Sequence, residues 1–248
     1  VPGLAIRYLS RFATRVAVTS EESYRYFDRD KVTVTGYPVR SEIYQVNRAD
    51  ARQKLGLEPE EKTLLVFGGS RGARSINKAL VAGLRELLPI CQIVHVSGRT
   101  DAEWVAGAAN SLPKDLRGRY QHFDYLHDMP LALVASDLVV ARAGAATLGE
   151  LPAARLAAVL VPYPHSGQHQ NPNADYMERN GVAKALPDDK LQERLVTTVK
   201  ALLRDETLLA AMQESARAMD RPDAAEAIAE LLWQAARRYS ARKAGTKP

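Results

Sequence analysis

The sequence predicts an α/β protein built on a doubly wound parallel sheet. Short apolar runs alternate with amphipathic helical patterns along the 248 residues, as expected for successive strand–helix–strand units. Several runs are apolar on both faces, which is typical of parallel strands covered by helices. These runs end in glycine-containing or small-residue loops, and ligands bind to such sheets at the carboxyl ends of the strands.

The first part of the chain shows both helical and strand patterns. Residues 4–14 place apolar side chains at helical spacing, with arginines on another face. Strand-like runs follow at 16–20 and 31–36, separated by a helix-like stretch at 21–27. The polar stretch 41–62 contains a further helical piece, ADARQKLGL.

From residue 63 onward the alternation is regular, and each apolar run is followed by a loop and a helical pattern. The predicted strands are 63–69, 92–98, 137–142 and 157–164, together with 119–126, where a strand runs into a loop. A loop and a helix that stops at Gly181 come next. Three closing helices are expected at about 188–204, 205–219 and 223–242.

The composition is that of an ordinary globular chain, with 46% hydrophobic and 25% charged residues. No apolar run reaches the roughly 18 residues that a membrane span needs, and the opening VPGLAIRYLSRF lacks the cleavage site of a signal peptide. The chain begins with Val1 and its first methionine is Met129, so we expect a fragment or a processed product. The single cysteine, Cys91, lies in an apolar run and is interpreted as a small buried side chain.

The first candidate ligand loop, GGSRGARSIN, follows the strand at 63–69 and opens a helix. Gly68, Gly69 and Gly72 would let the backbone approach a ligand, and the helix offers free N–H groups to an anion. Ser70 could donate its hydroxyl to a phosphate. Tight strand-to-helix packing would explain the glycines equally well. The loop lacks the GxGxxG spacing, and no acidic residue ends the next strand to hold a ribose, so a nicotinamide cofactor is not favoured.

A second loop of the same kind, RAGAATLGE, follows the strand at 137–142. Gly144 and two alanines make a thin turn at a helix N-terminus, which favours a diphosphate. Glu150 would repel the phosphates but could accept hydrogen bonds from sugar hydroxyls; a helix-dipole or capping role explains it as well on position alone. Without a metal, a leaving diphosphate would need the helix N-termini and a basic side chain such as Arg40 or Arg142.

The third loop, YPHSGQHQNPNA, gathers side chains that can bond a sugar, among them His169 and Gln170. A metal site is not expected here, because a glycine interrupts the spacing from His165 to His169 and no acidic ligand is close. Asp28 and Asp30 resemble an acidic metal motif but lie in a polar turn before a strand. We therefore expect neither a metal nor another cofactor.

Taken in order, these loops resemble the MurG family, the transferases that add N-acetylglucosamine to the lipid-linked muramoyl-pentapeptide of peptidoglycan synthesis. The matching pieces are GYPVR, LLVFGGSRGARSIN, VSGR, DYLHDM, SDLVVARAGAATLGE and VLVPYPHSGQHQNPNA. Their order and spacing over residues 1–240 are more specific than any single motif. The resemblance implies a fold of the GT-B type, in which the C-terminal Rossmann-like domain binds UDP-N-acetylglucosamine.

The resemblance also implies which residues bind the donor. Arg40 and Ser70 correspond to diphosphate and nucleotide contacts, and Leu126 to a residue whose backbone holds the uracil. Glu150 corresponds to the carboxylate that binds the ribose hydroxyls. The remaining expected contacts are Ala145, Ala146 and Thr147 under the phosphates, and His169 and Gln170 at the sugar. The family often has a pair of glutamines at the sugar, so His169 departs from its pattern.

We expect three regions along the chain. Residues 1–35 would be a remnant of the N-terminal acceptor-binding domain, residues 36–222 the UDP-sugar donor-binding domain, and residues 223–248 a helix that crosses back, followed by a basic tail. The glycine-rich loops with which the family's N-terminal domain binds the acceptor and supplies the base are not found in the sequence, so no catalytic base is assigned. The whole enzyme would carry out an inverting, metal-independent transfer to lipid I. This fragment alone is expected to bind the donor without turnover.

The acceptor is lipid-linked, so the resemblance implies peripheral attachment to the inner leaflet, at the cytoplasmic face of the cell membrane. The stretch LAIRYLSRFATR is amphipathic and basic, as an interfacial helix is, but such a face more often packs in a core. The net charge of +5 suits anionic partners. Nucleic acid is not expected, because the sequence shows neither an aromatic stacking array nor a known nucleic-acid module.

Two alternatives remain open. Another UDP-sugar enzyme of the same architecture, such as a UDP-N-acetylglucosamine 2-epimerase, would have a different acceptor half and acid/base carboxylates. A non-catalytic nucleotide-sugar-binding module would bind the same ligand without turnover.

Overall fold

The computed structural model describes residues 2–69, 72–164 and 170–244. The chain divides into two compact units. One consists of Val1–Val39 together with Asp220–Pro248, and the other of Arg40–Met219.

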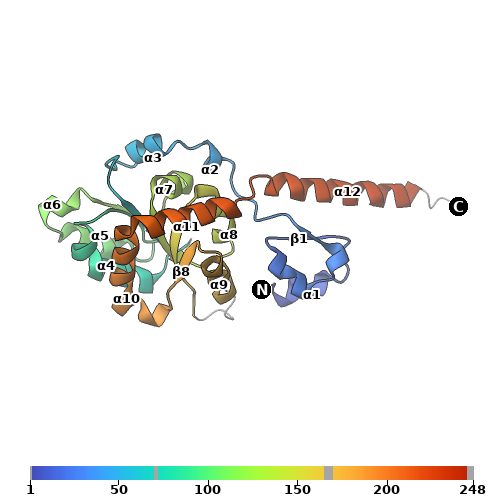
Figure 1. Cartoon of the computed structure of the whole chain (residues 1–248), viewed down its shortest axis with the longest axis horizontal. Helices are drawn as coiled ribbons and strands as arrows, with labels where there is room; N and C mark the ends of the chain where they lie inside the picture. Colours follow the sequence, from blue (N-terminus) through green and yellow to red (C-terminus); the bar gives the residue numbers. More distant parts are fainter. Residues whose placement is uncertain (1, 70–71, 165–169, 245–248) are drawn as a thin grey trace. The chain divides into compact units, whose positions relative to one another are not determined.

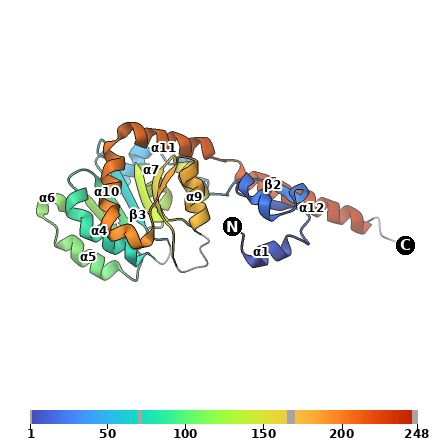
Figure 2. The same ribbon diagram turned by 60° about the horizontal axis from the view of Figure 1, so that its bottom comes forward.

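The unit Arg40–Met219 is built on a six-stranded parallel sheet with helices on both faces (Figure 1, Figure 2). The strands lie in the order β5-β4-β3-β6-β7-β8, and every neighbouring pair is parallel. Their bounds are Thr63–Phe67 for β3, Gln92–Val96 for β4, Tyr120–Phe123 for β5, Leu138–Arg142 for β6, Ala157–Val161 for β7 and Ala183–Ala185 for β8. The predicted doubly wound parallel sheet is therefore confirmed.

The direction of winding reverses between β3 and β6. From β3 the chain steps through β4 to β5 on one side, then returns to β6 beside β3 and continues through β7 to β8. At such a reversal the two connections leave the sheet in opposite directions, and a crevice remains at the carboxyl ends of the two strands. The loops that follow β3 and β6 are the two glycine-containing loops that the sequence singles out.

Helices join and cover the strands of this unit. Their bounds are Glu42–Gln45 for α2, Arg48–Lys54 for α3, Arg74–Leu87 for α4, Ala102–Asn110 for α5, Lys114–Arg117 for α6, Met129–Ala135 for α7, Thr147–Ala154 for α8, Asn171–Arg179 for α9, Leu191–Arg204 for α10 and Glu206–Met219 for α11. A 3-10 turn, η3, spans Asp188–Lys190 before α10. The strand β8 was not predicted, because Ala-Lys-Ala is too short to show an alternating pattern.

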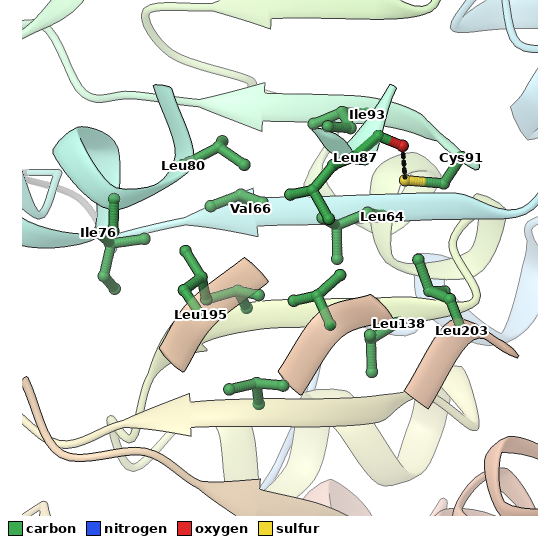
Figure 3. Close-up of a cluster of buried hydrophobic side chains, with 14 of the residues drawn as sticks. Leu64, Val66, Ile76, Leu80, Leu87, Cys91, Ile93, Leu138, Leu195 and Leu203 are labelled. Carbon is green, nitrogen blue, oxygen red and sulfur yellow. Dashed lines mark hydrogen bonds between the residues drawn. The ribbon is translucent and has the colours of Figure 1, made fainter. Parts of the chain in front are cut away.

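The main core lies between the sheet and the packed helices α4 and α10 (Figure 3). Leu64 and Val66 of β3 belong to one buried cluster with Ile76 and Leu80 of α4 and Leu195 of α10. All five side chains are at most 1% exposed. Because burying an aliphatic side chain of this size stabilises a fold by about 1.5–3 kcal/mol, this layer holds α4 and its N-terminus firmly against the end of β3.

Cys91 belongs to the same cluster and is fully buried, as predicted (Figure 3). Its thiol donates to the Leu87 carbonyl oxygen at 3.4 Å. Burial raises the pKa of the Cys91 thiol to about 12. The thiol is therefore a packing group rather than a nucleophile.

Arg155 ends α8 in the left-handed conformation, with φ 54° and ψ 45°. It is the one non-glycine residue with positive φ within 2–69, 72–164 and 170–244. An L-residue pays roughly 1–2 kcal/mol for this conformation, and the Arg155 side chain is exposed. We expect Arg155→Gly to raise the free energy of unfolding by about 1 kcal/mol, or the Tm by roughly 2–4 °C, in thermal circular dichroism.

A matched change at the end of α10 is the control for this prediction. Arg204 is also an exposed arginine, but it lies in regular helical structure. Arg204→Gly should lower the Tm, because glycine weakens a helix. A Tm for Arg155→Gly that falls as well would show that the left-handed residue is not strained.

The other unit contains a parallel pair of short strands, β1 at Val16–Val18 and β2 at Val32–Val34. They confirm the predicted strands at 16–20 and 31–36, although both are shorter than expected. The helical elements of this unit are Leu4–Leu9 for α1, the 3-10 turns Glu21–Tyr26 and Arg29–Lys31 for η1 and η2, and Ala224–Ala244 for α12.

The apolar side chains of α1 are exposed. Leu4, Ile6, Tyr8 and Leu9 are 56–83% exposed, and α1 contains no buried residue. The expectation that this amphipathic face packs in a core is therefore wrong for the described part of the chain. None of the helices in that part combines the length and the apolar character that crossing a membrane requires.

Candidate functional site

A cleft of about 680 Å³ lies at the carboxyl ends of β3 and β6. Ligand sites in proteins typically enclose roughly 300–1,000 Å³, so this cleft has the size for a nucleotide-sized molecule. The loops after β3, β6 and β7 all contribute to its wall, as the sequence predicts. Residues that line it include Gly72, Arg74, Gly144, Thr147, Glu150 and Gln170.

The loop after β6 is a tight turn with open amides. The Thr147 hydroxyl donates to the Gly144 carbonyl oxygen at 2.6 Å, and the Thr147 N–H reaches the same oxygen at 3.2 Å. The N–H groups of Ala145 and Ala146 have no hydrogen-bond partner among the described residues. A Cβ built on Gly144 would meet no atom within 4 Å. The turn therefore presents two free amides and open space at the N-terminus of α8, where the helix dipole favours an anion.

The loop after β3 depends on glycine for packing. Gly72 has φ 74°, a conformation that L side chains rarely adopt. A Cβ added there would also come within 2.3 Å of the Ser97 carbonyl oxygen at the end of β4. Close backbone packing thus explains Gly72, and the result of that packing is that Ala73 and Arg74 begin α4 at the cleft.

Glu150 lines the cleft from the first turn of α8 and is half-buried. Burial raises the pKa of the Glu150 carboxyl, and the positive charge of Arg40 acts in the opposite direction. Among the described residues no N–H donates to the Glu150 carboxylate, so a capping role finds no support, while its place in the first turn of α8 still suits the helix dipole. A desolvated carboxylate without donors is an acceptor ready for hydroxyl groups.

Arg142, at the end of β6, is engaged by protein groups. Its guanidinium forms an ion pair with Asp188 and donates to the Ser75 hydroxyl at 2.8 Å, and Ser75 in turn donates to Asp188 at 2.7 Å. It also donates to the carbonyl oxygens of Val161 and Pro162. Asp188 compensates its charge, so Arg142 joins the ends of α4, β6 and β7 rather than offering a free cation, which corrects the expectation that it neutralises a diphosphate.

The remaining predicted residues lie at different distances from the cleft. Ala146, Thr147, Glu150 and Gln170 line it, while Ala145 lies in the same turn. The Gln170 side-chain oxygen accepts the N–H of Tyr163 at 3.0 Å, which ties the start of α9 to the loop after β7.

Four further predicted contacts complete the set. Arg40 does not line the cleft, but α2 packs against α8 and the charge of Arg40 acts on Glu150. Leu126 is half-buried in the loop after β5, outside this cleft. Ser70 and His169 lie outside the described residues.

Sequence reasoning missed Arg74, Ser75 and Asp188, which also line the cleft. Arg74 and Ser75 directly follow the first glycine loop and open α4, so their place at the carboxyl edge could have been inferred. Asp188 follows β8, and because that strand was not predicted, nothing in the pattern pointed to this residue. Among the described residues no group of three or more His, Cys, Asp or Glu side chains is arranged to hold a metal ion.

Residues 63–228 match the C-terminal domain of glycosyltransferase family 28. The chain belongs to glycosyltransferase family 28. This family 28 chain is 43% identical to a UDP-N-acetylglucosamine–N-acetylmuramyl-(pentapeptide) pyrophosphoryl-undecaprenol N-acetylglucosamine transferase of Roseiflexus sp. (strain RS-1), over 94% of this chain and 61% of that protein. It is 40% identical to a protein of the same name from Desulforamulus reducens, over 93% of this chain and 64% of that protein. The chain thus spans less than two thirds of the length of these relatives.

Solved structures show the same fold. The crystal structure of Acinetobacter baumannii MurG matches with a TM-score of 0.73 and 27% identity, over 94% of this chain and 64% of that one. The predicted resemblance to MurG and the GT-B fold are confirmed. A UDP-GlcNAc 2-epimerase from Neisseria meningitidis, solved with UDP-GlcNAc, matches with a TM-score of 0.65 at 13% identity over 92% of this chain and 63% of that one, which is a likeness of fold alone.

Proposed function

We propose that this chain binds UDP-N-acetylglucosamine in the cleft between the ends of β3 and β6. It would supply donor binding to an inverting transferase that moves N-acetylglucosamine onto lipid I to give lipid II in peptidoglycan synthesis. The names of the relatives at 43% and 40% identity support this donor and acceptor. The observation that carries the proposal is the turn at Ala145 and Ala146, whose amides have no partner among the described residues and follow the open space at Gly144.

In this proposal each part of the donor has its own contacts. The diphosphate lies against the turn formed by Ala145, Ala146 and Thr147, and the ribose hydroxyls donate to Glu150. The other contacts follow the family resemblance: Arg40 and Ser70 with the diphosphate and nucleotide, the Leu126 backbone with the uracil, and His169 and Gln170 with the sugar. A diphosphate beside a helix N-terminus and a hydroxyl donor beside a desolvated carboxylate are both favourable pairings.

The reaction proposed is a displacement at the anomeric carbon. An acceptor sugar hydroxyl attacks that carbon, a base removes the hydroxyl proton, and UDP leaves with the bonding electrons. Negative charge then grows on the diphosphate, where the N-termini of α4 and α8 stabilise it without a cation. This chain contributes the stabilisation of the leaving group, and the acceptor contacts and the base lie outside the proposal for its own residues.

The partners proposed beyond the donor are the lipid-linked muramoyl-pentapeptide and the membrane that carries it. An acceptor anchored in the inner leaflet requires the enzyme to work at the cytoplasmic face of the cell membrane, as a peripheral protein. The family resemblance supports this placement.

Calorimetry on the 248-residue chain tests the proposal directly. We expect UDP-N-acetylglucosamine to bind with one site per chain, and UDP to compete with it. GDP-mannose serves as the control, because it has the same diphosphate but a different base and sugar, and it should bind at least tenfold more weakly. Absence of binding by UDP-N-acetylglucosamine, or equal binding by GDP-mannose, would contradict the proposed donor.

Metal removal gives a second prediction for the same site. Because helix N-termini and amides hold the diphosphate in this proposal, adding EDTA should leave the Kd for UDP-N-acetylglucosamine unchanged within about twofold. Titrations in excess EDTA and in excess magnesium provide the comparison. A strict requirement for magnesium would show that a cation, rather than the turn, carries the diphosphate.

A further inference from the structure

Arg74 is the first residue of α4 and lines the cleft together with Gly144 and Glu150. Its side chain is 62% exposed, yet it is anchored at one point, where Nε donates to Asp101 Oδ1 at 2.9 Å. Asp101, in contrast, is 3% exposed. The two terminal nitrogens of the Arg74 guanidinium have no partner among the described residues.

Asp101 lies at the end of a buried chain of hydrogen bonds. The donor and the acceptor of each bond follow from the chemistry of its neighbours. The Asn77 amide nitrogen donates to Asp101 Oδ2 at 2.9 Å and to the Ser97 carbonyl oxygen at 2.8 Å. Both neighbours accept only, so the orientation of the Asn77 amide is fixed and its oxygen faces His95. His95 Nε2, 2.9 Å away, must then carry the proton, and His95 Nδ1 accepts from the Tyr120 hydroxyl at 2.6 Å.

In this buried chain of hydrogen bonds each donor and acceptor described above has a partner. Only Asp101, at its end, carries a charge. Burial lowers the pKa of His95 to about 3, so the imidazole is neutral, which agrees with the single proton that the geometry assigns to it. Burial acts to raise the pKa of Asp101, but the neighbouring side chains of Trp104, Asn77 and Arg74 outweigh it and lower that pKa. The carboxylate therefore keeps its charge beside Arg74, and buried networks of this kind hold one geometry.

Arg74 and Arg142 are the two basic residues among those described that line the cleft, and they differ in one respect. Asp188, Ser75 and two carbonyl oxygens occupy the guanidinium of Arg142. Within the described part of the chain Arg74 is held through Nε alone, which leaves its terminal nitrogens for a ligand. An arginine oriented in this way can donate two parallel hydrogen bonds to a phosphate.

We infer that Arg74 binds the diphosphate of the donor and that Asp101 is the residue that positions it. This inference rests on the proposed function. The hydrogen bonds that run from Tyr120 through His95 and Asn77 hold Asp101 in place behind the first glycine loop. Asp101 in turn orients the guanidinium of Arg74 so that its terminal nitrogens face the cleft. The amides of the second loop and the guanidinium of Arg74 then hold the diphosphate from two sides.

Calorimetry with UDP and with uridine tests the role of Arg74 in the 248-residue chain. Arg74→Gln should weaken UDP binding about tenfold, because a charge-assisted bond to the diphosphate is lost. The affinity for uridine, which has no diphosphate, should stay unchanged. Arg85 lies exposed at the other end of α4, so Arg85→Gln is the matched control and should bind UDP as the wild type does. A Kd for UDP within twofold of the wild type in Arg74→Gln would overturn the inference. Failure of the wild type to bind UDP would instead contradict the proposed function.

A double-mutant cycle tests the positioning role of Asp101. Asp101→Asn should weaken UDP binding severalfold when Arg74 is present. In the Arg74→Gln background it should have no further effect, because the guanidinium that Asp101 positions is already gone. A merely structural role would lower the affinity in both backgrounds, and that result would overturn the role of Asp101. If Asp101→Asn does not fold, Arg74→Lys gives the answer, since a lysine keeps the charge but not the Nε anchor. It should bind UDP at least threefold more weakly, and full affinity would contradict positioning.

Discussion

Gly144→Val is expected to weaken binding of UDP-N-acetylglucosamine by more than a hundredfold while leaving the fold unchanged. A Cβ at Gly144 would meet no protein atom within 4 Å, and Gly144 is not among the glycines with positive φ. The added side chain therefore costs the protein little, but it fills the space beside the Ala145 and Ala146 amides. A ligand that must lie against those amides loses both its contacts and its room. Calorimetry and thermal circular dichroism together measure the two effects.

Gly118→Val is the matched control for this change. Gly118 is exposed at the end of α6, where an added Cβ also meets nothing within 4 Å, and it does not line the cleft. We expect this variant to bind the donor as the wild type does. Normal binding by Gly144→Val would mean that the diphosphate does not lie against this turn.

Glu150→Ala is expected to weaken UDP-N-acetylglucosamine binding by about thirtyfold to a hundredfold. The ribose hydroxyls donate to the carboxylate in charge-assisted hydrogen bonds, and a total loss of about 2–3 kcal/mol for these bonds corresponds to this range. Glu103 also lies in the first turn of its helix, α5, and is exposed, so Glu103→Ala is the control and should leave the Kd unchanged. Unchanged affinity in Glu150→Ala, with an intact circular dichroism spectrum, would refute the role at the ribose.

The pH dependence of binding provides an independent view of the same residue. Burial raises the pKa of Glu150, and hydroxyl donors favour its ionised form, so donor binding lowers that pKa again. The affinity should therefore be highest above the pKa of the free protein and fall as the pH drops through it. UDP-N-acetylglucosamine is suited to this test because its diphosphate is esterified at both ends and does not titrate near neutral pH. Glu150→Gln should abolish the Glu150-dependent part of the profile, and an identical profile in that variant would contradict the assignment.

The sheet and the position of the cleft could be predicted from sequence because both follow from local patterns. Continuous apolar runs such as 63–69 and 137–142 must be buried on both faces, and strands of that kind are typical of a parallel sheet covered by helices. Glycine loops after two of those runs then mark the edge where a ligand binds. The boundaries were less accurate, as the predicted strand at 92–98 shows: β4 ends at Val96.

The parts of the site that depend on long-range pairing were not predictable. Asp188 reaches Arg142 and Ser75 across 46 and 113 residues of sequence, and no local pattern connects them. For the same reason Arg142 resembled a free cation in the sequence, although its partner neutralises it in the fold. The buried chain that ends at Asp101 combines Tyr120, His95 and Asn77 from separate elements, so the histidine alone looked like an ordinary strand residue.

A crystal structure of the chain with UDP-N-acetylglucosamine bound, grown without divalent cations, tests the central claim most directly. We expect diphosphate oxygens within about 2.7–3.2 Å of the amide nitrogens of Ala145 and Ala146, with the ribose hydroxyls on Glu150. A nucleotide bound away from the Gly144 turn, or a diphosphate that binds only through an added metal ion, would contradict it.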